Sequence, residues 1–158
     1  MANVSLIPVT GIIQNIRQAG NNCCEQQISI VNNNGITNFI ISPSTYVINA
    51  TRLRQGMQVT AFYDGNLPVP LIFPPQYRAM IIGLKPPRET IFAGNFNNRL
   101  VAADNSLQLN ISNSTEITTA NGQRFTCSPG GHLLIVYYST TTKSIPPQTT
   151  PRRIIVMC

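Results

Sequence analysis

The sequence predicts an all-β protein made of two tandem OB-like five-stranded small barrels, and three observations lead to this prediction. Ile, Val and Thr supply 44 of the 158 residues, and β-branched side chains favour strands. No segment carries a 3.6-residue apolar stripe over three helical turns. Four short sequence blocks recur once, in the same order. The same strands also allow an alternative, a single ten-stranded β-sandwich.

The recurring blocks define two repeats of similar length. The pairs are 40–48 with 110–118, 56–64 with 131–139, 74–77 with 146–149, and 78–82 with 152–156, at offsets of 70, 75, 72 and 74 residues. The domains that follow are an OB-like β-barrel repeat over 1–85 and a second over 86–158. Two prolines in Lys85-Pro86-Pro87 make the junction stiff and extended.

In the first repeat, apolar runs separated by turn residues predict the strands. The expected strands are 9–16, 27–31, 36–41, 58–63 and 78–84, with a short strand or corner at 45–48. Asn34-Gly35 suits a type I′ turn between the second and third strands. A single helical turn is expected at Leu53–Gly56. Five short strands in about 70 residues are typical of an OB-type or SH3-type barrel.

The second repeat has the same expected order of strands. They are 90–96, 99–103, 107–111, 132–138 and 152–157, with a turn at Asp104-Asn105.

Residues 56–79 carry a resemblance to a known group of proteins. They contain Gly56-Met-Gln-Val59 leading to Tyr63-Asp64, and then Pro74-Pro75-Gln76-Tyr77-Arg-Ala. This stretch resembles small uncharacterised β-barrel proteins of Clostridia-type Firmicutes, which pair a Gly-x-x-Val-x-x-x-Tyr-Asp strand with a Pro-Pro-Gln-Tyr-x-Ala strand. The resemblance implies a bacterial protein of OB-like character, and it implies no activity, substrate or catalytic residue.

One proline-rich loop stands out as a candidate binding surface. Its apolar residues would form a costly patch in water. The candidate partner-binding residues are Leu71, Ile72, Phe73 and Tyr77. The corresponding segment of the second repeat, Thr140–Ile145, is polar. The loop either packs on a barrel or serves as a surface for a protein partner or for self-association, and its prolines would reduce the entropy lost on docking.

The charge balance suggests a second candidate function. Only 10% of the chain is charged, against roughly a quarter in an average domain, and the net charge is +6. OB-type barrels bind single strands through stacking and a basic groove. Candidate anion or nucleic-acid contacts are Arg52, Arg54, Arg78 and Arg152. One residue of the pair Phe62-Tyr63 and one of the pair Tyr137-Tyr138 are expected in the core, because side chains alternate along a strand.

Catalytic and metal-binding patterns are lacking in the sequence. The five carboxylates form no recognisable pair, His132 is expected to be structural, and the four cysteines show no zinc spacing. We expect no enzyme, no cofactor, no metal and free thiols. No signal peptide or apolar run of membrane-spanning length occurs, so a cytoplasmic protein is expected. The leading hypothesis is a bacterial structural or protein-interaction module that self-assembles. Single-stranded nucleic-acid binding is the alternative.

Overall fold

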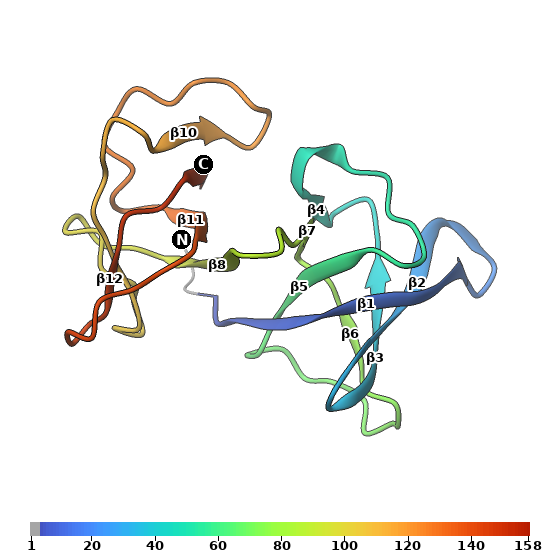
Figure 1. The fold of residues 1–158 in the computed structure, drawn as a ribbon. Coiled ribbons are helices and arrows are strands. Elements are labelled where there is room, and N and C mark those ends of the chain that lie inside the picture. The colour runs from blue at the N-terminus through green and yellow to red at the C-terminus, as the bar shows by residue number, and fades with distance from the viewer. Residues whose placement is uncertain (1–3) are drawn as a thin grey trace. The chain divides into compact units, whose positions relative to one another are not determined.

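The computed structural model describes residues 4–158, and this part of the chain is built from β-strands. A single 3-10 turn, η1 (Ile48–Ala50), is its one helical element. The all-β prediction is therefore confirmed. The described chain divides into two compact units, Ser5–Lys85 and Pro86–Cys158, the second together with Val4 (Figure 1).

The first unit contains one seven-stranded sheet. Its strands are β1 (Leu6–Ala19), β2 (Asn22–Asn32), β3 (Gly35–Ile41), β4 (Tyr46–Val47), β5 (Gln58–Asp64), β6 (Gln76–Arg78) and β7 (Ile81–Leu84). They lie in the order β4-β7-β5-β1-β2-β3-β6. The pairs β3–β6 and β4–β7 are parallel, and the other neighbours are antiparallel.

Two turns of the first unit differ from the sequence-based expectation. Strands β2 and β3 do form a hairpin, in which Asn32 lies opposite Gly35. Only Gly35 has a positive φ there, of 111°, so the type I′ prediction is wrong. The one 3-10 turn lies at η1 and not at Leu53–Gly56, and within it Asn49 and Ala50 adopt positive φ in a tight corner after β4.

The strand predicted over 78–84 is two strands that lie far apart in the sheet. Strand β6 is at one end of the strand order, and β7 is next to the other end. Only Ala79 and Met80 separate them. Ala79 donates its N–H to Ile40, and Met80 donates to Phe62. The sheet must curl strongly for two residues to join its ends, yet no hydrogen-bonded ladder closes it. The prediction of a closed OB-like barrel is not confirmed.

The inner face of this sheet carries the core of the first unit. Alternate residues of neighbouring strands contribute to it, as the two-residue period of a strand requires. Its buried members are Ile13, Ile28, Ile30, Phe39, Ile41, Val59, Ala61, Ala79 and Ile82. Phe62 is buried at 1% exposure and Tyr63 is partly exposed. Burial does not alternate along β5, because Val59–Phe62 are all buried, and Tyr63 packs against the core from the face of Val59 and Ala61.

The second unit has shorter strands in two sheets. Strands β8 (Thr90–Asn95), β10 (Glu116–Thr119), β11 (Leu133–Tyr138) and β13 (Arg153–Met157) form a sheet in the order β10-β13-β11-β8, and β9 (Gln108–Leu109) pairs with β12 (Gln148–Thr149). Its core contains Phe96, Ala102, Leu107, Leu109, Leu134, Val136, Ile154 and Val156. The described strands thus form three sheets and not one ten-stranded sandwich.

The strand predicted over Arg99–Ala103 does not form. The Asn97 side chain accepts hydrogen bonds from the N–H groups of Arg99 and Val101, at 2.9 and 3.1 Å. Leu100 adopts a φ of 60°, which breaks an extended strand. Isolated bridges at Val101 and Ala102 remain. The strand predicted over 107–111 is reduced to β9, because its partner β12 is only two residues long.

The two units share a pattern of hydrogen bonds. Thr45 Oγ1 donates to the Ala79 carbonyl and Thr115 Oγ1 to the Pro151 carbonyl, each at 2.7 Å. Before each threonine, serine hydroxyls two residues apart are bonded to each other. These matches have offsets of 70 and 72 residues.

The pairing of the parallel strands corrects the sequence alignment of the last block. Tyr46 lies opposite Ile81, and Glu116 lies opposite Arg153. Ile81 therefore corresponds to Arg153, an offset of 72 residues in place of the 74 in the alignment.

Candidate functional site

The loop between β5 and β6 holds three of the predicted partner-binding residues at its tip. Leu71 and Phe73 expose 102% and 94% of their reference areas, and Ile72 exposes 52%. Leu71 and Phe73 are the most exposed large apolar side chains among the first unit's described residues. The tip therefore does not pack on the sheet of its own unit, and packing on the second unit stays a prediction.

Tyr77, the fourth predicted partner-binding residue, lies apart from that tip. It belongs to β6, where its ring stacks on Tyr63 of β5 with the ring centres 3.7 Å apart and the planes 7° from parallel. Phe39 of β3 packs against both rings at 5.9 and 6.3 Å. Three strands thus position one aromatic cluster at the edge of the first unit's core.

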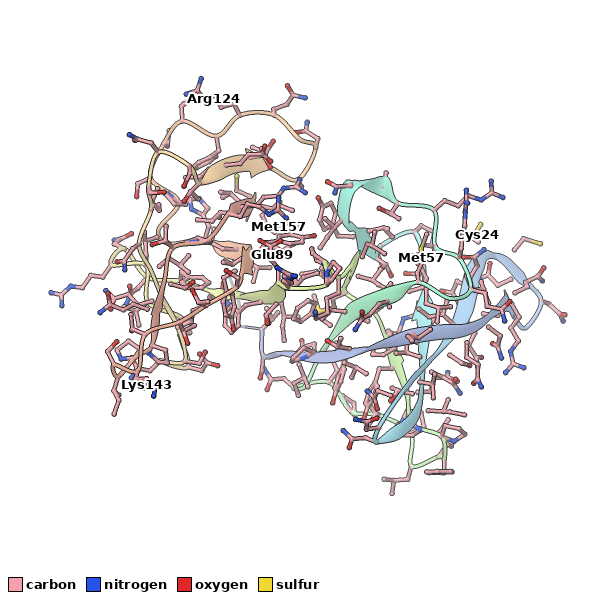
Figure 2. The ribbon with its side chains drawn as sticks, in the orientation of Figure 1. Cys24, Met57, Glu89, Arg124, Lys143 and Met157 are labelled. Atoms are coloured by element: carbon pink, nitrogen blue, oxygen red, sulfur yellow. The ribbon has the colours of Figure 1, made fainter. Side chains whose placement is uncertain are left out.

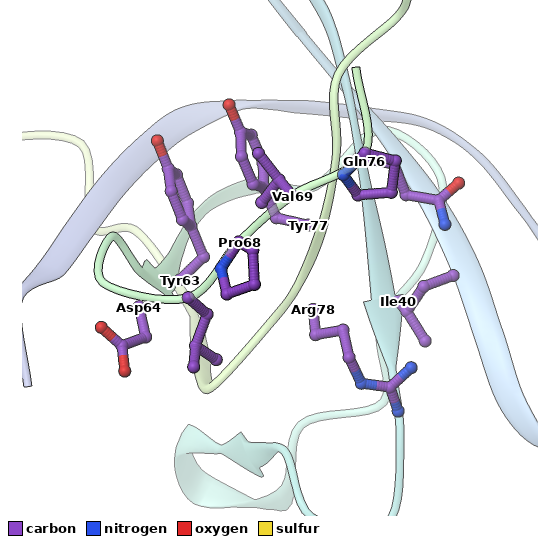
Figure 3. A pocket seen from close by; sticks show the side chains of 10 residues that line it. Ile40, Tyr63, Asp64, Pro68, Val69, Gln76, Tyr77 and Arg78 are labelled. Carbon is purple, nitrogen blue, oxygen red and sulfur yellow. The ribbon is translucent and has the colours of Figure 1, made fainter. Parts of the chain in front are cut away.

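A pocket of about 260 Å³ opens beside this cluster (Figure 3). Tyr63 and Tyr77 stand parallel in it, and the first half of the proline-rich loop passes over them. Its lining consists of Ile40, Tyr63, Asp64, Leu67, Pro68, Val69, Pro70, Gln76, Tyr77 and Arg78. The sequence did not single out Leu67–Pro70 as a wall. The available signal was the alternation along β5, which puts Tyr63 on the face of Val59 and Ala61.

One member of the stacked pair, Tyr63, has a shifted pKa. Desolvation by burial, followed by a hydrogen bond with Tyr77, raises the pKa of Tyr63 from 10.0 to about 12. The phenol is therefore neutral at physiological pH. The two tyrosine rings therefore give the pocket an uncharged aromatic wall for a ligand to contact.

The predicted anion-contact arginines differ in their partners. Arg78 NH2 bonds to Glu25 at 2.7 Å, and Arg152 holds Glu89 through Nε and NH2 at 2.8 to 3.0 Å. Arg52 and Arg54 are exposed in the segment between η1 and β5. Two of the four candidates are thus partly neutralised by carboxylates.

The carboxylates and the histidine of the described chain have structural partners. Glu116 pairs with Arg153 at 3.4 Å, and the sidechain of Asp64 accepts the N–H of Asn66. Asp104 likewise accepts the N–H of Ser106. His132 Nδ1 lies 3.1 Å from the carbonyl of Gly130, and its ring meets Phe125 edge-on.

The four cysteines are exposed thiols without disulfides. Cys23 and Cys24 lie at the start of β2, in the long hairpin that it forms with β1, and Figure 2 labels Cys24 there. Within residues 4–158, no group of three or more His, Cys, Asp or Glu side chains is placed to hold a metal ion. No helix in the same range has the length and apolar character needed to cross a membrane.

Comparisons with known proteins leave the resemblance to Firmicutes β-barrel proteins as a prediction. The chain matches no protein-family model, and searches of curated proteins and of solved structures return no match.

Proposed function

We propose that this protein is a non-enzymatic interaction module of a bacterial cytoplasm, which self-associates through the proline-rich loop of its first unit. The observation that carries the proposal is the nearly complete exposure of Leu71 and Phe73. Burying a large apolar side chain lowers the free energy by about 1.5–3 kcal/mol. A contact with a neighbouring copy that covers Leu71 and Phe73 would be stabilised by this burial.

The composition of the loop supports the same proposal. Pro68, Pro70, Pro74 and Pro75 restrict its backbone, so docking it costs less conformational entropy than docking a flexible loop. The polar loop at the same position in the second unit exposes one large apolar side chain, Ile145, at 92%. The first unit is therefore the better interaction surface.

The proposal that the module is non-enzymatic draws on the carboxylates. Glu25, Glu89 and Glu116 are each bonded to an arginine, and two aspartates cap turns. Such partners occupy the carboxylate oxygens that a catalytic role would need. We also propose that the two units are copies of one OB-like repeat, 1–85 and 86–158, on the strength of their matched hydrogen bonds.

Sedimentation velocity over a range of protein concentrations tests self-association. The wild type is expected to gain mass as concentration rises, whereas the double variant Leu71→Ser/Phe73→Ser stays monomeric. Ile145→Ser is the matched control, because it removes an equally exposed apolar side chain from the second unit. A wild type that remains monomeric at every concentration contradicts the proposal.

Single-stranded nucleic-acid binding is the second candidate, and one observation favours it. Arg52 and Arg54 are two residues apart and exposed. Binding of a labelled single-stranded oligonucleotide should then weaken steeply as salt is added, because phosphate contacts release counterions. Arg52→Ala/Arg54→Ala should reduce the affinity, with Arg124→Ala as an exposed control in the second unit. No binding at low salt removes this candidate.

A further inference from the structure

Strand β6 has an open edge next to the pocket. It is the last strand of the first sheet and pairs only with β3. Asn38 donates to the carbonyl of Pro75, and Ala79 donates to the carbonyl of Ile40. In a parallel pair, this pattern directs the backbone groups of alternate residues away from the partner strand. The N–H and C=O of Gln76 therefore point toward the outer edge.

In the second unit, the backbone groups on the corresponding strand edge have hydrogen-bond partners. Gln148 of β12 corresponds to Gln76 of β6. The Gln148 N–H donates to Thr142 Oγ1 at 3.0 Å, and the Thr142 N–H donates to the Gln148 carbonyl at 2.8 Å. The loop before β12 thus folds back and covers the edge of its own strand.

The loop before β6 does not make these bonds. Tyr63 and Tyr138 are 75 residues apart, while Gln76 and Gln148 are 72 apart, so the first unit's loop is three residues longer. Pro68 and Pro70 have no N–H to donate. No residue in 4–158 bonds to the backbone N–H or C=O of Gln76. An unpaired strand edge is a template for an added strand.

The pocket adds a place for a side chain beside that edge. Gln76, Tyr77 and Arg78, which are the whole of β6, line it together with the Tyr63 ring and Pro68 (Figure 3). A strand added along β6 would point alternate side chains toward this apolar wall. The geometry fits an extended peptide that carries an apolar side chain.

The loop tip of another copy carries such side chains, and the hydrogen bond from the Ile72 N–H to the Pro70 carbonyl, which turns the tip at Leu71, would open when the tip pairs as a strand. Leu71 and Phe73 are exposed and apolar, and they alternate as the residues of an added strand do. The N–H and C=O of Leu71 make no hydrogen bond in residues 4–158. Tip and edge belong to the same unit, so a two-fold axis lets each copy give its tip and receive the other's.

We propose that residues Leu71–Phe73 of a second copy add as a strand to the open edge of β6. Leu71 pairs its N–H and C=O with Gln76, which places Ile72 on the same face as Tyr77, so that the Ile72 side chain enters the pocket beside Tyr77. This inference rests on the proposed self-association and names the surface that receives the tip.

A proline substitution tests the pairing with little change to the unit itself. Gln76→Pro removes an N–H that points outward and that the sheet does not use, and proline is tolerated at such positions of edge strands. Gln76→Ala keeps the N–H and is the matched control. Sedimentation velocity should show self-association about a hundredfold weaker for Gln76→Pro than for wild type, because each of the two symmetric pairings loses a hydrogen bond and leaves a carbonyl without a donor, at about tenfold per pairing. Gln76→Ala should stay close to wild type.

A synthetic peptide of residues 69–75 separates the failure of this inference from that of the proposed function. The labelled peptide should bind the wild type and Gln76→Ala, and it should bind Gln76→Pro about tenfold more weakly. Circular dichroism confirms that both variants fold, and a variant whose spectrum has changed is replaced by Tyr77→Ser, which should weaken peptide binding through the pocket.

Three outcomes overturn the inference. If self-association depends on Leu71 and Phe73 but is equal in Gln76→Pro and Gln76→Ala, the proposed function stands and strand addition is wrong. If the peptide binds in a Gln76-dependent manner while the protein stays monomeric, the edge serves a strand of another protein. If the protein is monomeric and no peptide binds, both proposals fail.

Discussion

The hydroxyl of Thr45 donates a 2.7 Å hydrogen bond to the carbonyl oxygen of Ala79, across 34 residues of sequence. Thr45 is buried at 9% exposure, and its Oγ1 also accepts the N–H of Ser42. The bond ties the corner before β4 to the short link between β6 and β7. This link brings the two ends of the first sheet together, so the bond holds the curled sheet in shape.

Replacing Thr45 by valine should therefore destabilise the first unit. Valine keeps the shape of the side chain and leaves the Ala79 carbonyl without its donor, which costs about 1–3 kcal/mol. The urea midpoint, followed by circular dichroism, measures the change. Thr115→Val should act in the same direction through Pro151, because it makes the equivalent bond. Ser44→Ala, at an exposed position beside Thr45, is the control. A midpoint for Thr45→Val equal to that of Ser44→Ala would show that this bond contributes nothing.

Tyr63 should lose its proton at a higher pH than an ordinary tyrosine. Its pKa is about 12 in the folded protein against 10.0 for the unperturbed group. The folded state holds this proton more tightly than the unfolded chain does, so the associated stability is complete below pH 10. It is lost as the pH rises through about 12. Ultraviolet absorbance of tyrosinate follows the titration, and Tyr63→Phe identifies the contribution of this residue.

Tyr77→Phe separates the two causes of this shift. The variant removes the hydrogen bond and retains the burial, which is the larger cause. The pKa of Tyr63 should then fall but remain above 10. A pKa of 10 in the wild type would contradict the close packing of the two rings.

Gly11 of β1 should not tolerate a side chain. A Cβ at this position would collide with the carbonyl oxygen of Val31 and would come within 2.7 Å of the Ile30 side chain. Gly11→Ala is therefore expected to lower the free energy of unfolding by about 1–3 kcal/mol, as overpacked positions do. Urea unfolding measures it.

Gly94→Ala is the matched control for Gly11. It also lies in a strand, but the nearest atoms to its Cβ belong to the Phe92 ring at 3.2 and 3.3 Å, and a side chain can shift. Its effect should stay below about 1 kcal/mol. Equal losses in the two variants would mean that the close approach of Val31 to Gly11 is unimportant.

Alternation and turn residues predicted much of the first unit. They located the strands around Ile13, Ile30 and Val59, because a strand buried on one face repeats every two residues. They left open which of Phe62 and Tyr63 lies in the core. The same reasoning missed the length of the β1–β2 hairpin. It is rich in Gln, Asn and Arg, which carry little apolar periodicity, and backbone pairing extends it.

The second unit was harder to predict because side chains there compete with the strand. Asn97 bonds to the backbone of Arg99 and Val101 and replaces a predicted strand by turns. Of the candidate site, the sequence left open whether Leu71 and Phe73 pack on a barrel or form a binding surface, and the structure shows both side chains exposed. The separation of Tyr77 from them was not predicted, since it depends on the packing of Tyr77 against Tyr63.

By itself, the sequence determined the all-β class and the positions of most apolar strand residues, because both follow from local propensity and period. The tertiary structure decided that β6 and β7 are separate strands at different places in the sheet. It also decided that Arg78 and Arg152 are bonded to Glu25 and Glu89. These features depend on contacts between residues more than 50 positions apart, or on which strands pair, and no local pattern encodes either.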